Sequence, residues 1–106
     1  MHAESKTLLR ELKAHLIALY TTRLRGVYLY GSYARGDCDP ESDFDVLVVL
    51  DDLGSYGAEV DRTAETVAAL SLEHAVSISL VFLREREWMN DESPFVRSVR
   101  TEAIAA

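Results

Sequence analysis

The chain has 106 residues, a formal net charge of −7 and one cysteine, Cys38. This length suits one domain with a modest core, so we expect residues 1–106 to form a single domain. No apolar run approaches the length of a membrane span, and the acidic balance argues against an extended nucleic-acid surface. One cysteine cannot form an internal disulfide and the N-terminus lacks a signal-peptide pattern, so we expect a cytoplasmic protein.

A first helix is predicted from about Glu4 to Tyr20. Leucines recur there at three- and four-residue spacing, which places them on one face that we expect to pack on a sheet. The predicted stripe consists of Leu8, Leu12, Leu16 and Leu19, widened by Leu9 and Ile17.

Arg10 and His15 in this helix have the spacing of the Arg-x4–6-His signature of HEPN ribonucleases. That fold is a helical bundle, whereas this chain continues into strands. We therefore assign the pair no function.

After a turn at Thr21–Gly26, a strand is predicted at Val27–Tyr30, and it leads directly into Gly31. Glycine lets the backbone turn sharply and approach a ligand closely. Ser32 would begin a short helix, where free N–H groups favour phosphate oxygens. Arg35 could contact a phosphate or pair with a nearby carboxylate, and the sequence leaves both roles open.

The second strand is predicted at Asp43–Leu50. Asp43 and Asp45 are two residues apart, so both carboxylates should lie on one face and form an oxygen site suited to Mg²⁺. The strand ends in the apolar run VLVVL, which is typical of a central strand buried on both faces. The segment 37–52 holds seven acidic residues and no Lys or Arg, a crowding that a cation would relieve.

The remaining elements are a loop at Asp51–Gly57, a helix at Ala58–His74, a third strand at Ala75–Leu83 and a short helix at Arg84–Met89. Ser93 and Pro94 are typical of an N-cap and first position, so a last helix should begin there. Together these elements predict an α/β (α+β) fold with a small mixed sheet of three to four strands and flanking helices.

The stretch from Gly31 to Asp45 reads GSYARGDCDPESDFD. It resembles the signature of the polymerase-β-like nucleotidyltransferases, which is Gly-Ser, a spacer of about ten residues, and Asp-x-Asp. The chain looks most like the minimal nucleotidyltransferases (MNT), small proteins of which many act as antitoxins beside a helical HEPN ribonuclease toxin.

The resemblance implies an enzyme that moves an NMP group, with AMP expected, from an NTP to a hydroxyl acceptor. For the antitoxin relatives it implies a tyrosine hydroxyl of the toxin as that acceptor. Asp43 and Asp45 would be the catalytic residues and hold one or two Mg²⁺ ions, while Gly31 and Ser32 would hold the β- and γ-phosphates of an NTP, expected to be ATP.

The third strand departs from the pattern of active members, which usually carry a third carboxylate there. This strand offers Ser77 and Ser79 and no acid, and Glu73 just before it cannot be placed from sequence. Three hypotheses therefore stay open: an active nucleotidyltransferase, an inactive MNT domain that neutralises a HEPN-like toxin by binding alone, and an acidic α/β domain with a relic motif. The acceptor, base specificity, metal count and oligomeric state are not encoded visibly.

Overall fold

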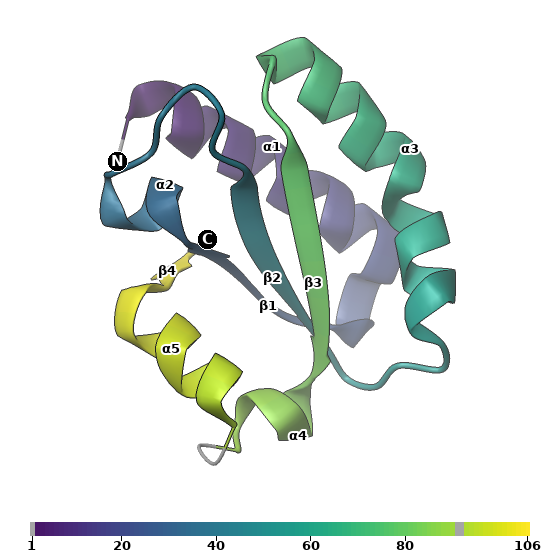
Figure 1. Cartoon of the computed structure of the whole chain (residues 1–106). Helices are drawn as coiled ribbons and strands as arrows, with labels where there is room; N and C mark the ends of the chain where they lie inside the picture. The colour runs from purple at the N-terminus through teal and green to yellow at the C-terminus, as the bar shows by residue number, and fades with distance from the viewer. Residues whose placement is uncertain (1, 91–92) are drawn as a thin grey trace.

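The computed structural model describes residues 2–90 and 93–106, and its elements follow the predicted order with one short strand added at the C-terminal end (Figure 1). The helices are α1 (Ala3–Tyr20), η1 (Thr21–Arg23, a 3-10 helix), α2 (Ser32–Arg35), α3 (Tyr56–His74), α4 (Glu85–Trp88) and α5 (Pro94–Glu102). The strands are β1 (Leu24–Tyr30), β2 (Phe44–Leu50), β3 (Ile78–Arg84) and β4 (Ile104–Ala105). None of the helices in the described residues is long and apolar enough to cross a membrane.

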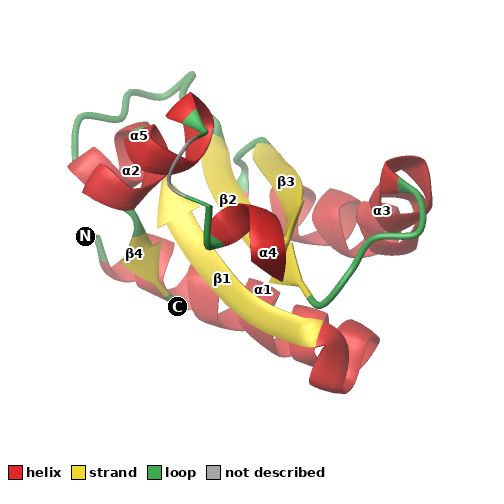
Figure 2. Cartoon of the chain, turned by 90° about the horizontal axis from the view of Figure 1, so that it is seen from below, coloured by secondary structure: helices red, strands yellow, loops and turns green. Residues whose placement is uncertain are grey.

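The four strands form one mixed sheet in the order β3-β2-β1-β4. β2 runs parallel to β3 and antiparallel to β1, and β4 pairs antiparallel with the outer side of β1. Helices α1 and α3 cover one face of the sheet, and α4 and α5 lie on the other (Figures 1 and 2). The predicted α+β fold with a small mixed sheet and flanking helices is confirmed.

β2 is the central strand and contributes to two separate cores. Phe44, Val46 and Val48 join the core under α1 and α3, called here the α1 face. Leu47 and Val49 join a smaller core under α4 and α5, called here the α5 face. Because side chains alternate along a strand, Asp45 is in phase with Leu47 and lies on the α5 face.

The predicted apolar stripe of the first helix is wrong at two positions. Ile17 and Leu19 are 49% and 39% exposed, whereas Ser5 and Tyr20 are buried. Tyr20 lies one turn beyond Leu16 on the same face of the helix. The buried face therefore continues to Tyr20 and does not include Leu19.

Helix α3 buries a charged residue, Glu59, in its first turn. Glu59 is 2% exposed, and its carboxylate accepts hydrogen bonds from Tyr20 Oη and Arg62 Nε, both at 3.0 Å. Arg23 lies 3.5 Å from its second oxygen. These partners offset the cost of desolvating the carboxylate, and Val60 is consequently turned outward and 45% exposed.

Side chains cap the outer edge of β3. The backbone N–H of Ile78 donates to Ser71 Oγ and that of Phe82 to Tyr56 Oη, both at 3.3 Å. Such capping removes donors that an added strand would need. The sheet edge at β3 is therefore poorly suited to pairing with another strand.

Candidate active site

The topology of the sheet brings the two halves of the Gly-Ser…Asp-x-Asp motif together. β1 and β2 are antiparallel, so the end of β1 lies beside the start of β2, where Tyr30 pairs with Asp45. Gly31 follows Tyr30 with φ 76° and ψ −157°, a conformation that side chains disfavour. A Cβ on Gly31 would also collide with Asp45 Oδ2. Glycine is thus required here for the turn and for the close approach to Asp45.

The spacer between Ser32 and Asp43 is a compact connection. The one-turn helix α2 ends at Gly36, which is left-handed with φ 82°. Asp39 then organises the following loop, since its Oδ1 accepts from the N–H of Glu41 at 2.8 Å and its own N–H donates to Ser42 Oγ at 2.9 Å. These turns return the chain to β2, where Asp45 lies next to Gly31.

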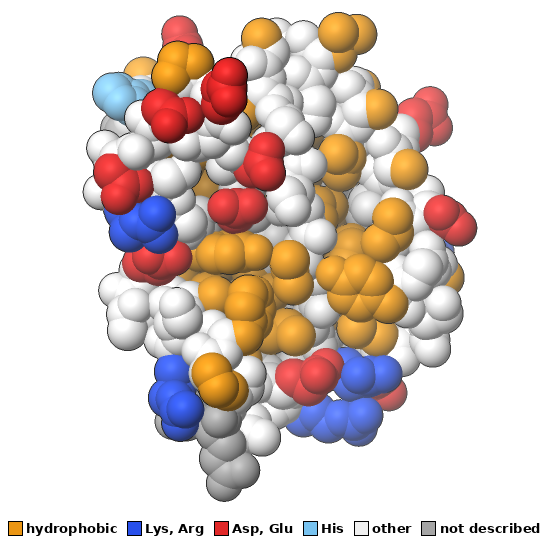
Figure 3. Space-filling view, in the orientation of Figure 1, with side chains coloured by type: hydrophobic (Ala, Val, Ile, Leu, Met, Phe, Trp, Pro, Cys, Tyr) orange, Lys and Arg blue, Asp and Glu red, His pale blue; other side chains and the backbone are white. Residues whose placement is uncertain are grey.

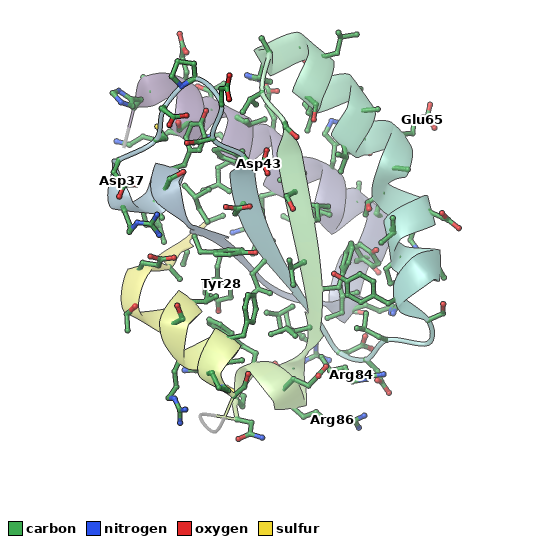
Figure 4. All side chains as sticks on the ribbon, in the orientation of Figure 1. Tyr28, Asp37, Asp43, Glu65, Arg84 and Arg86 are labelled. Atoms are coloured by element: carbon green, nitrogen blue, oxygen red, sulfur yellow. The ribbon has the colours of Figure 1, made fainter. Side chains whose placement is uncertain are left out.

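Asp43, which is labelled in Figure 4, lies immediately before β2 and is exposed. Asp45 is half-buried within the strand. In residues 2–90 and 93–106, no group donates a hydrogen bond to either carboxylate. Burial raises the pKa of Asp45 above its usual range, and the negative charge of Asp43 adds to the effect. Two neighbouring carboxylates with free oxygens fit a divalent cation, which would remove their mutual repulsion.

Ser79 occupies the position on β3 next to this pair. It is in register with Asp45 in the parallel β2–β3 ladder, so both side chains lie on the α5 face. Ser77 lies before the strand and its carbonyl accepts from the N–H of Phe44 at 2.8 Å. Where active relatives are expected to place a third carboxylate, this chain therefore places the Ser79 hydroxyl.

Glu73 does not supply the missing acid. Its carboxylate lies with Glu11 and His74 in a group whose possible ligand atoms are within 4.8 Å of one another. His74 Nε2 is 2.9 Å from Glu11 Oε2, which joins the end of α3 to α1. This group belongs to the α1 and α3 layer, across the sheet from Asp45.

Arg35 pairs with two carboxylates, which is one of the two roles that the sequence left open. Its Nε donates to Asp37 Oδ2 at 3.1 Å and its Nη1 donates to Glu102 Oε2 at 2.9 Å. The other oxygen of Glu102 accepts from the backbone N–H of Gly31 at 2.9 Å. Glu102 is the site residue that sequence reasoning missed, because no local pattern links the end of α5 to a turn 71 residues earlier.

Next to the acidic residues, the α5 face of the sheet is apolar and open. Figure 3 shows acidic side chains over the start of β2 and hydrophobic atoms below them between α5 and α3. Tyr30 packs edge-on against Phe95 with ring centroids 5.9 Å apart. Burial, with the charge of Asp45 second, raises the pKa of Tyr30 to about 12. Asp45 thus borders a hydrophobic surface that a ligand or partner could contact.

A family model and curated relatives both indicate the same protein family. The family model described as "Nucleotidyltransferase domain" matches residues 9–104. Two curated proteins of Methanocaldococcus jannaschii, both named "Putative protein adenylyltransferase", are similar to the chain. The first is 31% identical over 78 residues, covering 74% of this chain and 78% of the relative. The second is 33% identical over 73 residues, covering 69% and 67%.

Solved structures share the fold. A structure described as a "putative minimal nucleotidyltransferase" is 28% identical with a TM-score of 0.59, covering 97% of this chain and 96% of the other. A toxin-antitoxin structure with AMP-PNP aligns with a TM-score of 0.65 at 21% identity, covering 90% and 69%. A chain from a structure described as a tri-AMPylated Shewanella oneidensis HEPN toxin in complex with an MNT antitoxin aligns with a TM-score of 0.61 at 20% identity. The alignment covers 95% of this chain and 70% of the other.

The family match spans nearly the whole chain, including β1, the Gly31–Ser32 turn, both aspartates and β3. The structural likeness extends over the same elements. The chain therefore belongs to the nucleotidyltransferase domain family, as the motif at Gly31 to Asp45 predicted.

Proposed function

We propose that this protein is a Mg²⁺-dependent nucleotidyltransferase that moves AMP from ATP to a hydroxyl group of a partner protein. The observation that carries the proposal is a pair of free carboxylates, of which Asp45 lies directly against Gly31 and Asp43 is two residues away on the same chain segment. Membership of the nucleotidyltransferase family supports the reaction class, and the M. jannaschii relatives support AMP and a protein acceptor.

Each residue of the site has a proposed role. Asp43 and Asp45 would hold one or two Mg²⁺ ions, which would screen the charges of the triphosphate and the carboxylates. The hydroxyl of Ser32, which has no hydrogen-bond partner in the described residues, would contact phosphate oxygens. Gly31 contributes the turn, since its own N–H is already donated to Glu102. Arg35 adds positive charge next to the phosphates while it remains paired with Glu102.

In the proposed reaction, the acceptor oxygen bonds to the α-phosphorus of ATP. The bond from that phosphorus to the oxygen bridging to the β-phosphate breaks, pyrophosphate leaves, and the acceptor hydroxyl loses its proton. A partner protein bound to the apolar α5 face beside Asp45 would exclude water from that side of the site, which would favour the protein acceptor over hydrolysis.

The proposed partner is a HEPN-type toxin in a toxin–antitoxin pair located in the cytoplasm. The support is the structural likeness to complexes of such toxins, one of which is described as tri-AMPylated. The acceptor group would be a tyrosine hydroxyl of the toxin, and this chain would act as the antitoxin.

A second candidate function is neutralisation by binding alone. It is favoured by Ser79, which stands beside Asp45 without the negative charge of a third carboxylate. In that case the domain would cover a toxin without modifying it, and the acidic pair would be a relic.

Label transfer separates these functions. Purified protein is incubated with Mg²⁺, ATP labelled at the α-phosphate, and lysate of its source or a purified HEPN-type partner. The test variant carries Asp43→Asn and Asp45→Asn. The matched control carries Asp51→Asn and Asp52→Asn, which remove two charges just after the opposite end of β2.

A labelled partner band with wild type and control, absent with the test variant, supports AMP transfer. Neutralisation of the partner without label, unchanged in the test variant, contradicts it and supports binding alone.

A further inference from the structure

Glu102 connects the C-terminal helix to the nucleotide-binding turn. Its two carboxylate oxygens are divided between two parts of the motif, the backbone N–H of Gly31 and the guanidinium of Arg35, each at 2.9 Å. Its side chain is 19% exposed, while that of Arg35 is 48% exposed. One carboxylate thus holds both ends of the short helix α2.

The backbone around Glu102 is itself held in place. Val96 and Val99 of α5 are buried against the sheet, at 1% and 2% exposure. Directly after Glu102, β4 pairs with β1, placing Ile104 opposite Leu29. Leu29 lies two residues before Gly31, so the strand that carries the turn also anchors the segment that carries Glu102. The position of the Glu102 carboxylate is therefore fixed by the packing of its backbone as well as by its own hydrogen bonds.

We propose that Glu102 is a positioning residue of the nucleotide site, which sets the Gly31–Ser32 turn and the direction of Arg35 for binding the triphosphate. This inference rests on the proposed function. Both oxygens of Glu102 have protein partners, so it is not assigned a metal. Its effect passes through Gly31 and Arg35, in the way that outer partners orient the groups that touch a ligand.

An opposite role for Glu102 makes the opposite prediction. A carboxylate beside a phosphate site could compete with the phosphates for Arg35, and its removal would then strengthen nucleotide binding. The two hydrogen bonds and the anchored backbone favour positioning, because an occluding group would need freedom to leave.

The first measurement is hydrogen exchange of the Gly31 amide in the free protein. Wild type should protect this amide. Glu102→Gln should keep most of the protection, because the amide oxygen of glutamine can still accept from Gly31, and Glu102→Ala should lose it. Equal protection in wild type and Glu102→Ala would overturn the proposed contact and the inference with it.

The second measurement is the affinity of the folded proteins for Mg²⁺-ATP by titration calorimetry, well below the melting temperature. We expect about tenfold weaker binding for Glu102→Ala and a smaller loss for Glu102→Gln. Arg35→Gln, which leaves α5 untouched, should weaken binding in the same direction. Glu85→Gln is the matched control, because Glu85 also faces an arginine, Arg25 at 3.9 Å, but lies at the far end of β3.

Binding by Glu102→Ala that equals or exceeds that of wild type would overturn the positioning role and leave the proposed function standing. A lower melting temperature with unchanged affinity would likewise reduce Glu102 to a structural contact. Failure of wild type itself to bind Mg²⁺-ATP would overturn the proposed function, and this inference with it.

Discussion

The two faces of the central sheet differ although they share the same strand. On the α1 face, Phe44, Val46 and Val48 have no exposed surface, and they share one core with the equally buried Leu12 and Leu16 of α1. On the α5 face, the same end of the sheet carries half-buried Asp45, Tyr30 and Ser79 and remains partly open (Figure 3).

This difference separates the part of the sheet that contributes most to stability from the part proposed to carry the chemistry. The larger core lies on the α1 face, so burial of apolar side chains there supplies more folding free energy than the smaller core of the α5 face. The α5 face instead carries two unpaired carboxylates, which cost stability when no cation is bound and which we propose bind Mg²⁺. Substitutions on the α1 face should therefore change mainly the free energy of unfolding, whereas substitutions near Asp45 on the α5 face should change mainly AMP transfer and Mg²⁺ binding.

The largest effect is expected from Asp45→Asn on the α5 face. We expect Mg²⁺-dependent AMP transfer to fall at least about a hundredfold, because an oxygen proposed to bind the metal is lost. The melting temperature without Mg²⁺ should not fall. Label transfer and thermal melts of the same preparation check both points. If the variant still transferred AMP at the wild-type rate, the α5 face would not carry the reaction.

On the α1 face, Leu12→Ala should destabilise the protein by about 3 kcal/mol, since it leaves a cavity in a fully buried position. Urea unfolding measures this change. Leu72→Ala is the matched control, because Leu72 is 85% exposed and its truncation should have almost no effect. Similar losses of unfolding free energy for the two variants would mean that the packing of α1 against the sheet does not stabilise the core.

Ser79→Asp would place a carboxylate in register with Asp45. We expect about tenfold tighter Mg²⁺ binding, equivalent to about 1.4 kcal/mol. The melting temperature without Mg²⁺ should fall, because a third negative charge joins two unpaired ones. Calorimetric titration with Mg²⁺ and thermal melts with chelator provide the test, and unchanged Mg²⁺ affinity would argue against a cation site at this position.

The smallest effect concerns pH and the free energy of unfolding. The folded-state pKa of Asp45 is raised from 3.8, so its ionisation is less favourable in the folded than in the unfolded protein. Stability is therefore lost as pH rises from about 3.8 through the folded pKa. Without Mg²⁺, Asp45→Asn should melt slightly higher than wild type at pH 7, and the gap should shrink at pH 3. Asp43→Asn should act in the same direction at pH 7, and a clear drop for either variant would indicate a structural hydrogen bond.

Much of the site follows from the sequence because its signals are local. Gly31 is required by a turn conformation, Asp43 and Asp45 share a face by strand periodicity, and the apolar run after them predicts a strand buried on both sides. These are relations between near neighbours in the chain. The roles of these residues in binding remain predictions, and the structure places Asp45 directly against Gly31.

Only the tertiary structure decided which distant groups complete the site. The register of the β2–β3 ladder selects Ser79 rather than Ser77 as the neighbour of Asp45. Packing of α5 and pairing of β4 with β1 bring Glu102 to Gly31 and Arg35. Periodicity and turn chemistry act over a few residues, whereas these contacts depend on how whole helices and strands pack. A local sequence pattern does not indicate which distant elements will pack together.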